Sequence, residues 1–467
     1  MTTKIKNICC IGAGYVGGPT MAVIADQCPE LKINVVDINN KRIEEWNDPV
    51  IDNLPIFEPG LSEIIERCRN KNLFFSTDIA KHISEADMIF ISVNTPTKTQ
   101  GIGAGKAIDL KWVESSARQI AKYAKGFTIV VEKSTLPVRT AQTIKNILES
   151  SNKGIENKKF SVLSNPEFLA EGTAISDLKN PDRVLIGGDD KNSINELVRI
   201  YLNWINEEKI ITTNLWSSEL SKLISNAFLA QRVSSINSIT ALCETTGADI
   251  KEVSEAIKTD QRIGKYFLEP GPGFGGSCFK KDILNLVYIC DHYGLFEVSS
   301  YWQKVVDIND WQSKRIQNII ISKLFGTISG KKISIFGFAF KANTNDTRES
   351  PAIKICKGLL EEGCRLSIYD PKVNQTQIEL DLGIPASIPC VNNLNISGWE
   401  YSQSVNDSTK NSDAIIVITE WNEFKDLNWK LISREMRSPA WLFDTRSICN
   451  IKEAKNNGIN VWRIGAE

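Results

Sequence analysis

Histidine is scarce in this chain of 467 residues, which contains only two, His82 and His292. Neither has partners at the spacing of a metal site, so the sequence predicts no metal and leaves acid–base chemistry to Lys, Asp, Glu or Cys. The eleven cysteines include no C-x-x-C pair. This excludes a zinc ribbon or a secreted disulfide framework and favours free thiols in a reducing cytosol.

Net charge and long apolar runs are also lacking. The 55 basic and 56 acidic residues leave a formal net charge of −1, which argues against a general nucleic-acid binder. No apolar run reaches membrane-spanning length, so we expect no membrane partner. The short apolar run before Gly14 leads directly into a glycine motif and is read as a strand, not as a signal peptide. A cytoplasmic protein of two to four domains is therefore expected.

The first recognisable motif is Gly12-Ala13-Gly14-Tyr15-Val16-Gly17. An apolar strand at 6–11 precedes it, a helix at 19–28 follows it, and a second strand at 33–36 ends at Asp37. This is G-x-G-x-x-G in the context that dinucleotide binding requires. The first glycine makes the tight turn, the second lets a pyrophosphate approach, and the third allows helix and strand to pack closely. Asp37 would accept from ribose hydroxyls and favours NAD over NADP, a preference that nearby Arg42 weakens.

Further strands are predicted at 88–93, 127–132, 161–163 and 184–187, alternating with helices. Each of the first three ends in a polar loop that contains proline. Because the carboxyl ends of parallel strands line the ligand crevice, Thr135, Glu167 and Glu171 lie where chemistry is expected. The same residue types also occur as ordinary turn formers.

The segment 271–282 is the most informative part of the chain. Its glycines deliver Cys278 to the start of a predicted helix, and Lys280, Lys281 and Asp282 follow within a turn. Helix-end amides and ammonium groups favour a thiolate, so the pattern is typical of a covalent nucleophile beside a substrate pocket. A buried structural cysteine is the alternative, because free cysteines are often buried.

A long helix is predicted at 217–246, and shorter ones at 249–259, 281–293 and 301–324. Lys222 and Asn226 are four residues apart on the long helix and share one face. A lysine in such a stretch is more often a surface residue whose stem covers apolar neighbours, so that interpretation is favoured from the helix alone.

The last third of the chain repeats the start imperfectly. A strand at 332–336 leads to Gly337, a helix spans 351–362, and a strand at 365–369 ends at Asp370. Strands at 414–419 and 441–444 complete this second unit, which lacks the three-glycine motif but can present a helix N-terminus, Lys341 and Arg348 to a phosphate. The polar stretch 384–411 is read as a surface insertion. The predicted fold is α/β, with two Rossmann-like doubly wound domains joined by a long central helix and a helical middle domain.

Eight strings together resemble the UDP-glucose/GDP-mannose dehydrogenase family, and within it the UDP-glucose 6-dehydrogenase branch. They lie at 12–17, 94–97, 133–137, 165–172, 216–226, 273–282, 337–341 and 346–350, so the resemblance runs essentially end to end. It implies an NAD-binding domain at 1–215, a central helical dimerisation domain with the cysteine loop at 216–328, and a UDP-sugar domain at 329–467.

The resemblance implies a four-electron oxidation of UDP-glucose to UDP-glucuronate with two NAD. Cys278 would trap the aldehyde as a thiohemiacetal, which becomes a thioester and is hydrolysed. Lys222 and Asp282 would hold a water near C6 and act together as the general base. Asn226 would support the same C6 oxygen. Thr135 and Glu167 would position or activate water.

The resemblance also implies two sets of binding residues. The cofactor set is Gly12, Gly14, Tyr15, Val16, Gly17, Asp37, Arg42, Val93, Thr95, Ser134, Thr135, Glu171, Lys281 and Arg348. The substrate set is Glu167, Phe168, Leu169, Glu171, Lys222, Asn226, Arg262, Phe267, Gly273, Phe274, Gly275, Cys278, Phe279, Phe340, Lys341 and Arg446. Arg262 would reach a neighbouring subunit's site in a homo-oligomer, either a dimer or a hexamer.

Three alternatives remain. The same chemistry could act on another nucleotide sugar, such as GDP-mannose or UDP-N-acetylmannosamine. A two-electron 3-hydroxyacid or 6-phosphogluconate-type dehydrogenase needs no cysteine, and the third domain argues against it. A non-catalytic nucleotide-sugar binding protein would be expected to have lost Cys278, Lys222 or Asp282.

Overall fold

The computed structural model describes residues 5–150, 158–387 and 397–466. The chain forms two compact units, Met1–Ser225 and Asn226–Glu467. The 32-residue helix α9 (Leu215–Thr246) begins in the first unit and ends in the second. Within the described ranges, no helix is both long and apolar enough to cross a membrane.

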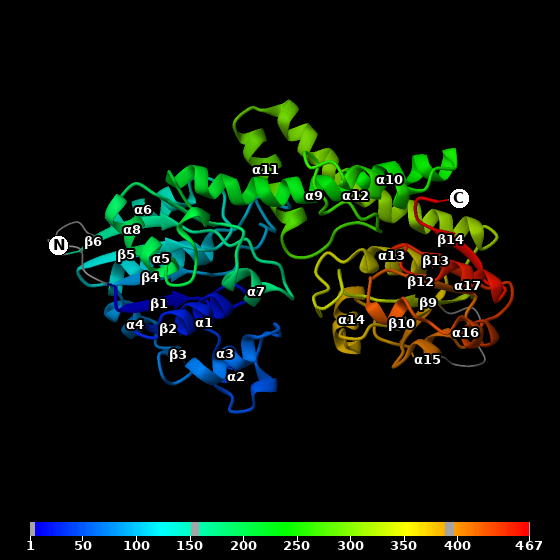
Figure 1. Ribbon diagram of the computed structural model, residues 1–467, viewed down its shortest axis with the longest axis horizontal. Helices are drawn as coiled ribbons and strands as arrows, with labels where there is room; N and C mark the ends of the chain where they lie inside the picture. Colours follow the sequence, from blue (N-terminus) through cyan, green and yellow to red (C-terminus); the bar gives the residue numbers. More distant parts are fainter. Residues whose placement is uncertain (1–4, 151–157, 388–396, 467) are drawn as a thin grey trace. The chain divides into compact units, whose positions relative to one another are not determined.

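The first unit is built on an eight-stranded sheet in the order β3-β2-β1-β4-β5-β6-β7-β8 (Figure 1). Neighbouring strands run parallel, except that β7 is antiparallel to β6. The six strands from β3 to β6 have the doubly wound order of dinucleotide-binding folds. The strands are β1 (Asn7–Ile11), β2 (Lys32–Val36), β3 (Leu73–Ser76), β4 (Met88–Ile91), β5 (Phe127–Glu132), β6 (Lys159–Ser164), β7 (Val184–Gly188) and β8 (Ile210–Thr213).

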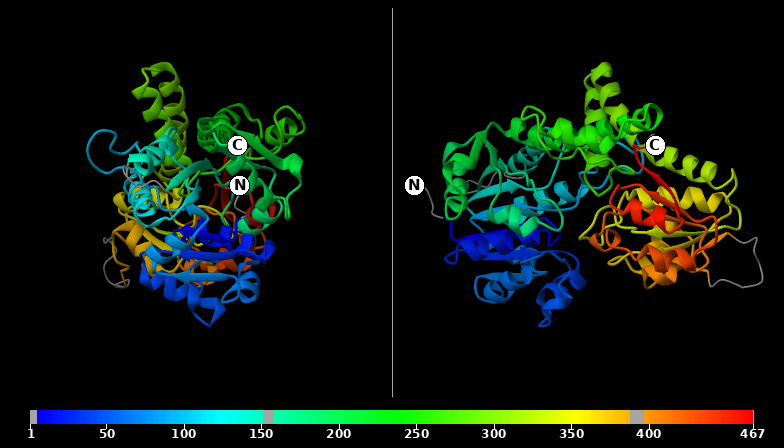
Figure 2. Two further views of the ribbon diagram at one scale, coloured as in Figure 1. Left: turned by 90° about the vertical axis from the view of Figure 1, so that its left-hand side faces the viewer. Right: turned by 45° about the vertical axis from the view of Figure 1, so that its right-hand side comes forward.

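Helices cover both faces of this sheet, as the turned views show (Figure 2). Alternate side chains of β1 enter two separate cores: Ile8 and Cys10 lie in one, Cys9 and Ile11 in the other. This alternation explains why the central strands are continuous apolar runs. The helices are α1 (Gly17–Gln27), α2 (Asn40–Asn47), α3 (Leu61–Cys68), α4 (Ile79–Glu85), α5 (Lys111–Tyr123), α6 (Thr140–Ser150), α7 (Ala174–Lys179) and α8 (Lys191–Tyr201), with short 3-10 turns η1 (Ile51–Asn53) and η2 (Glu207–Lys209).

The second unit begins with helices: the end of α9, then α10 (Ile250–Lys258), α11 (Phe279–His292) and α12 (Phe296–Lys323). Asp249 caps α10 by accepting from the amide of Lys251. The same carboxylate pairs with Arg463, and the amide of Gly465 donates to Glu244 of α9 at 2.8 Å. These bonds fasten the end of the chain to the helical part of its own unit.

The sheet of the second unit has six parallel strands in the order β11-β10-β9-β12-β13-β14. This is again the doubly wound order, so the predicted α/β class with two Rossmann-like sheets is confirmed. Its strands are β9 (Lys332–Phe336), β10 (Arg365–Tyr369), β11 (Gly398–Tyr401), β12 (Ala414–Val417), β13 (Trp441–Asp444) and β14 (Asn460–Arg463), and its helices are α13 (Pro351–Glu361), α14 (Gln375–Leu382), α15 (Val405–Thr409), η3 (Asn422–Phe424), α16 (Trp429–Glu435) and α17 (Ile451–Asn456).

The prediction that 384–411 is a surface insertion is wrong for much of its described part. Strand β11 extends the sheet, α15 follows it, and Trp399 is buried with 1% of its surface exposed. Residues 388–396 of the predicted insertion lie outside the described residues.

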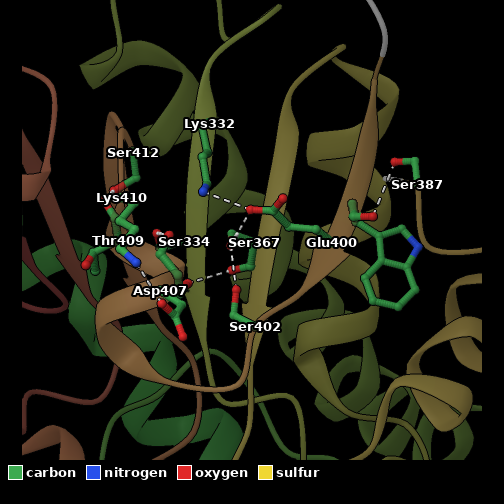
Figure 3. A network of polar contacts seen from close by, with 12 residues as sticks. Lys332, Ser334, Ser367, Ser387, Glu400, Ser402, Asp407, Thr409, Lys410 and Ser412 are labelled. Atoms are coloured by element: carbon green, nitrogen blue, oxygen red, sulfur yellow. Dashed lines mark hydrogen bonds and ion pairs between the residues drawn. The ribbon is translucent and has the colours of Figure 1, made fainter. Parts of the chain in front are cut away.

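Serine-rich sequence in this region serves buried hydrogen bonds. Ser367 on β10 contacts Ser402 at 2.7 Å and donates to Glu400 on β11 at 2.9 Å, and Lys332 on β9 pairs with Glu400 at 2.8 Å (Figure 3). Ser334 on β9 donates to the carbonyl of Ser408 in α15. Polar composition therefore does not signal an exposed loop here, because the network satisfies these groups inside the fold.

Candidate functional site

The glycine motif forms a tight turn between β1 and α1. Gly12 has φ +108°, and a Cβ there would lie 2.1 Å from the carbonyl oxygen of Ser92. A Cβ on Gly17 would lie 2.0 Å from the carbonyl oxygen of Gly12. Both positions therefore require glycine, one for the turn and one for close packing of α1 on β1.

Gly14 differs from its two neighbours in the motif. A Cβ at this position would meet only the Arg42 guanidinium, at 3.8 Å, so space beside the backbone is open. No side chain caps α1 at Val16, and Tyr15 is exposed. An open backbone at a helix N-terminus is suited to a phosphate.

Asp37 follows β2 and is half-buried. Its Oδ2 accepts from the amide of Ala13 at 2.9 Å, inside the glycine turn, and its Oδ1 accepts from the amide of Asn39 at 2.9 Å. The acid is thus fastened beside the turn with surface left over for a ligand. The arrangement fits the ribose and pyrophosphate of a dinucleotide.

The ends of β4 and β5 are tied together beyond this turn. Ser134 donates through Oγ to the carbonyl of Val93 at 2.8 Å. Thr95 is half-buried in the same loop. Predicted cofactor residues thus come from two strand ends of the first sheet, next to the turn that carries Gly12.

A second cluster of the first unit joins Thr135, Glu167 and Lys222. The Thr135 hydroxyl donates to Glu167 Oε1 at 3.1 Å, and Lys222 Nζ lies 3.6 Å from the same oxygen. All three residues are at least nine-tenths buried. Lys222 is 4% exposed, so the surface interpretation favoured from its helix is wrong: the lysine faces a carboxylate and the Phe168 ring, not solvent.

Glu167 Oε2 is buried and, within the described residues, has no hydrogen-bond partner. An unpartnered buried carboxylate oxygen is costly in an inert site and is typical of a functional one. The loop from β6 to α7 carries this residue together with half-buried Phe168, Leu169 and Glu171. The guanidinium carbon of Arg183, the residue before β7, lies 3.9 Å from the centroid of the Phe168 ring and supports the loop.

Cys278 is the N-cap residue of α11, as the sequence predicts. It is half-buried, and its Sγ lies 3.4 Å from the Ser277 hydroxyl. Cys449 is also half-buried, but burial raises the pKa of its thiol well above the usual range. The other described cysteines are buried. Cys278 therefore combines exposure with the favourable dipole of a helix N-terminus.

One turn after Cys278, Asp282 is completely buried. Its Oδ2 accepts from the Asn226 amide at 2.6 Å, and Lys281 Nζ lies 2.9 Å from its Oδ1. The second unit thus brings together Asn226, Lys281 and Asp282 near the N-cap cysteine. A buried carboxylate with a cation and an amide donor is equipped to hold or move a proton.

The glycine loop before Cys278 is held by residues that sequence reasoning missed. Asn309 on α12 accepts from the amide of Phe274 at 2.7 Å and donates to its carbonyl at 3.2 Å. Gln312 and Ser313 donate to the carbonyls of Gly271 and Pro272. Gly273, at φ +132°, has no room for a Cβ because Asn309 would lie 2.9 Å away. Buried polar residues at helical spacing on α12 were the available signal.

Aromatic side chains surround the cysteine loop. The Phe279 ring lies 6.0 Å from that of Phe267 and 5.8 Å, edge-on, from that of Phe274. Gly275 and Gly276 pack against Phe340, where a Cβ would come within 2.8 to 3.1 Å of it. Within the second unit, the rings of Phe267, Phe274 and Phe279 therefore pack together, and Phe340 lies against the glycines of the same loop.

The predicted cationic residues have different surroundings. Arg446 is half-buried; it donates to the carbonyls of Ile418 and Phe340 and lies beside Gly271. Arg348 is exposed and held by Asp346, and exposed Arg262 is held by Asp260. Half-buried Lys341 lies next to the Phe340 ring. The structure thus groups Arg446 and Lys341 near Phe340, whereas Arg262 stands on an exposed loop.

Asp370 occupies in the second sheet the position that Asp37 has in the first. It is 2% exposed, and its Oδ2 accepts from the amides of Phe338 and Ala339 at 2.6 and 3.0 Å. Its Oδ1 accepts from Lys372 and Val373. Both oxygens are used internally, so this acid is not available to a ribose.

Three family models match the chain in succession. The NAD binding domain of the UDP-glucose/GDP-mannose dehydrogenase family matches residues 6–205, the central domain matches 216–311, and the UDP binding domain matches 334–451. Together they cover well over half of the sequence.

Plant proteins are similar over nearly the whole length. UDP-glucose 6-dehydrogenase 4 of Arabidopsis thaliana is 54% identical over 98% of this chain and 97% of its own, and UDP-glucose 6-dehydrogenase 1 of Glycine max is 53% identical with the same coverage. Among solved structures, a UDP-glucose dehydrogenase from Pyrobaculum islandicum is 27% identical with a TM-score of 0.83, covering 99% of this chain and 98% of its own.

Proposed function

The chain belongs to the UDP-glucose/GDP-mannose dehydrogenase family, and from this premise we propose that it oxidises UDP-glucose to UDP-glucuronate with NAD. The structural observation that carries the proposal is the half-buried Cys278 at the start of α11, one turn before the buried Asp282. A nucleophilic cysteine in this position can retain an aldehyde as a covalent intermediate so that it is oxidised again.

Two molecules of NAD, held one after the other by the glycine turn and Asp37, would each accept one of the two hydrides that leave C6 of the glucose. The open space beside Gly14 and the fastened carboxylate of Asp37 fit this cofactor. Side chains of the protein carry out the proton transfers, the covalent attack and the hydrolysis.

In the first oxidation, Lys222 and Asp282 hold a water that passes the proton of the C6 hydroxyl to the Asp282 carboxylate. The ammonium of Lys222 stabilises the negative charge that develops on the C6 oxygen, and Asn226 supports this oxygen. A buried cation is effective in this role because it replaces water with a fixed charge. The product of the step is an aldehyde.

Cys278 then forms a bond from Sγ to C6, and the thiol proton passes to the aldehyde oxygen. Loss of the second hydride and of the hydroxyl proton turns this thiohemiacetal into a thioester. Glu167, positioned by the Thr135 hydroxyl, removes a proton from the water that attacks the thioester carbonyl. The C–S bond breaks, and the carboxylate product and the free thiol are released.

The sugar and nucleotide are held by the aromatic and cationic groups of the second unit. We assign the sugar to the loop 273–276 with Phe279, and the nucleotide end to Phe340, Lys341 and Arg446. The division into domains at 1–215, 216–328 and 329–467, assembly into a homo-oligomer in which Arg262 reaches a neighbouring subunit, and a cytoplasmic location complete the proposal.

The test is the yield of NADH per UDP-glucose with purified protein and with the variants Cys278→Ser and Cys449→Ser. We expect two NADH per sugar, loss of full turnover in Cys278→Ser, and normal turnover in Cys449→Ser, which alters the other half-buried cysteine. One NADH per sugar, or normal turnover in Cys278→Ser, would refute the covalent mechanism. Two NADH only from another nucleotide sugar would keep the mechanism and reject the substrate.

A further inference from the structure

The loop between β6 and α7 carries Glu167 and Glu171. None of this loop belongs to a helix or a strand, so neither holds the two glutamates in place. Asn165 is fastened by its amide to the carbonyl of Glu132, and Thr173 closes a turn onto Ala170. Gly172 takes φ +85°, which reverses the chain directly after Glu171. The position of both glutamates depends on what holds the backbone between these points.

Two carboxylates from outside the loop hold it on both sides of Glu171. Glu58 accepts through Oε1 from the amide of Gly172 at 2.7 Å and through Oε2 from the amide of Ala174 at 3.1 Å. Asp177 accepts through Oδ2 from the amide of Ala170 at 3.0 Å and from the Thr173 hydroxyl at 2.9 Å.

Glu58 is itself buried and packed beside a hydrophobic core. It is 4% exposed, although it belongs to a loop between η1 and α3. The carbonyl of Glu58 accepts from the amide of Leu61, and Ile56, Leu61 and Ile175 share one hydrophobic core. A buried carboxylate with two charge-assisted bonds is a strong anchor, because charged acceptors form shorter and stronger bonds than neutral ones.

The position of the β6–α7 loop matters most for Glu167. Its Oε2 is buried with no hydrogen-bond partner in the described parts of the chain, so its direction follows from the Thr135 bond, Lys222 and the path of the loop. Reacting groups lose effectiveness when they are displaced by about 1 Å, which a loosened loop permits. We propose that Glu58, with Asp177, is a positioning residue that fixes the β6–α7 loop for the hydrolytic step. This inference rests on the proposed function.

The experiment compares Glu58→Gln with the wild type and with Glu63→Gln, which changes an exposed acid in the first turn of α3. Glutamine keeps the shape but presents an NH2 group to one of the two amides. We expect kcat to fall about tenfold, because one charge-assisted bond is lost and one donor is left facing a donor. Glu58→Asp should recover part of the loss, since it keeps the charge.

The step that becomes slow can be identified from the chemical state of Cys278 during turnover. During turnover of UDP-glucose, mass spectrometry of acid-quenched Glu58→Gln should show more Cys278 carrying the sugar as a thioester than in the wild type. Hydrogen exchange should rise at the amides of residues 170–174, and alkylation of Cys278 by iodoacetamide should keep its wild-type rate. Glu63→Gln should match the wild type in each measurement.

Faster exchange at 170–174 with unchanged kcat and unchanged thioester would overturn the inference. So would a fall in kcat without added thioester, accompanied by faster exchange throughout the first unit, because that pattern reports general destabilisation. Failure of the proposed function is separate: it shows in the wild type, as fewer than two NADH per UDP-glucose.

Discussion

Replacing Glu132 by glutamine should stabilise the protein, and the gain should grow with pH. Glu132 ends β5 with 2% of its surface exposed, and its carboxyl group has Glu219 as an electrostatic neighbour, which is 3% exposed at the start of α9. Glu219 in turn accepts from the amides of Arg139 and Ala141, both at 2.7 Å. The pair links the loop of Thr135 to the helix of Lys222.

Burial raises the pKa of Glu132 well above its usual value, and the neighbouring carboxylate of Glu219 raises the pKa further. An acid with a raised folded-state pKa contributes stability that is complete below its unfolded pKa. That contribution is lost as the pH rises through the folded pKa. In between, the folded chain binds one more proton than the unfolded chain, so the free energy of unfolding falls by about 1.4 kcal/mol per pH unit.

Glutamine can still donate to Glu219 and binds no proton. The difference in the free energy of unfolding between Glu132→Gln and the wild type should therefore rise by about 1.4 kcal/mol per pH unit. Urea unfolding at several pH values, from about pH 5 upward, measures it up to the folded pKa of Glu132, using the transition of the first unit. Glu149→Gln, an exposed acid on α6, is the control and should give a difference that does not change with pH. A pH-independent difference for Glu132→Gln would refute the raised pKa of Glu132.

Further predictions concern the cofactor turn, the central lysine and the cysteine loop. Gly14→Ala should fold normally but bind NADH at least about tenfold more weakly, as measured by calorimetry. Gly12→Ala should fail to fold because its Cβ meets a carbonyl oxygen. Normal NADH binding by Gly14→Ala would contradict the assignment of the pyrophosphate to this turn. Lys222→Met should lower kcat by about 10² to 10³ without loss of thermal stability, and a loss below tenfold would remove its oxyanion role. Asn309→Leu leaves the amide and carbonyl of Phe274 without hydrogen bonds, so it should lower the free energy of unfolding in urea by about 2 to 3 kcal/mol and slow the alkylation of Cys278. Asn309→Asp should lower the free energy of unfolding less, and equal losses in the two variants would argue against these two bonds.

The central strands were predictable because buried parallel strands are continuous apolar runs. Strand β5 and strand β9 have the bounds that their sequences indicate. Strands β3, β8, β11 and β14 were not predicted, and these four strands are the edges of the two sheets. Edge strands carry less of the apolar signal on which prediction depends.

The candidate site divides in a similar way. The turn at Gly12 and the loop at Cys278 are local in sequence, so their residue types indicate their geometry directly. The burial of Lys222 was not predictable, because a lysine among apolar helix neighbours is usually a surface residue. Glu58 and Asn309 were missed because their partners are far along the chain; Gly172 is 114 residues from Glu58. Only the folded chain brings such pairs together.

Both carboxylate oxygens of Asp370 accept hydrogen bonds from the backbone of the chain itself, and this has a kinetic consequence. Within the described residues, the second sheet repeats the topology of the first but uses its acid to fasten its own backbone, so under the proposed function Asp37 is the one acid of this kind that is left to bind a ribose. Two successive hydride acceptors must then pass through the same place, and the first must depart before the second arrives. A half-oxidised sugar would be free to diffuse away during this exchange. Under the proposed function, the bond to Cys278 keeps the sugar attached to the enzyme while NADH is exchanged for NAD.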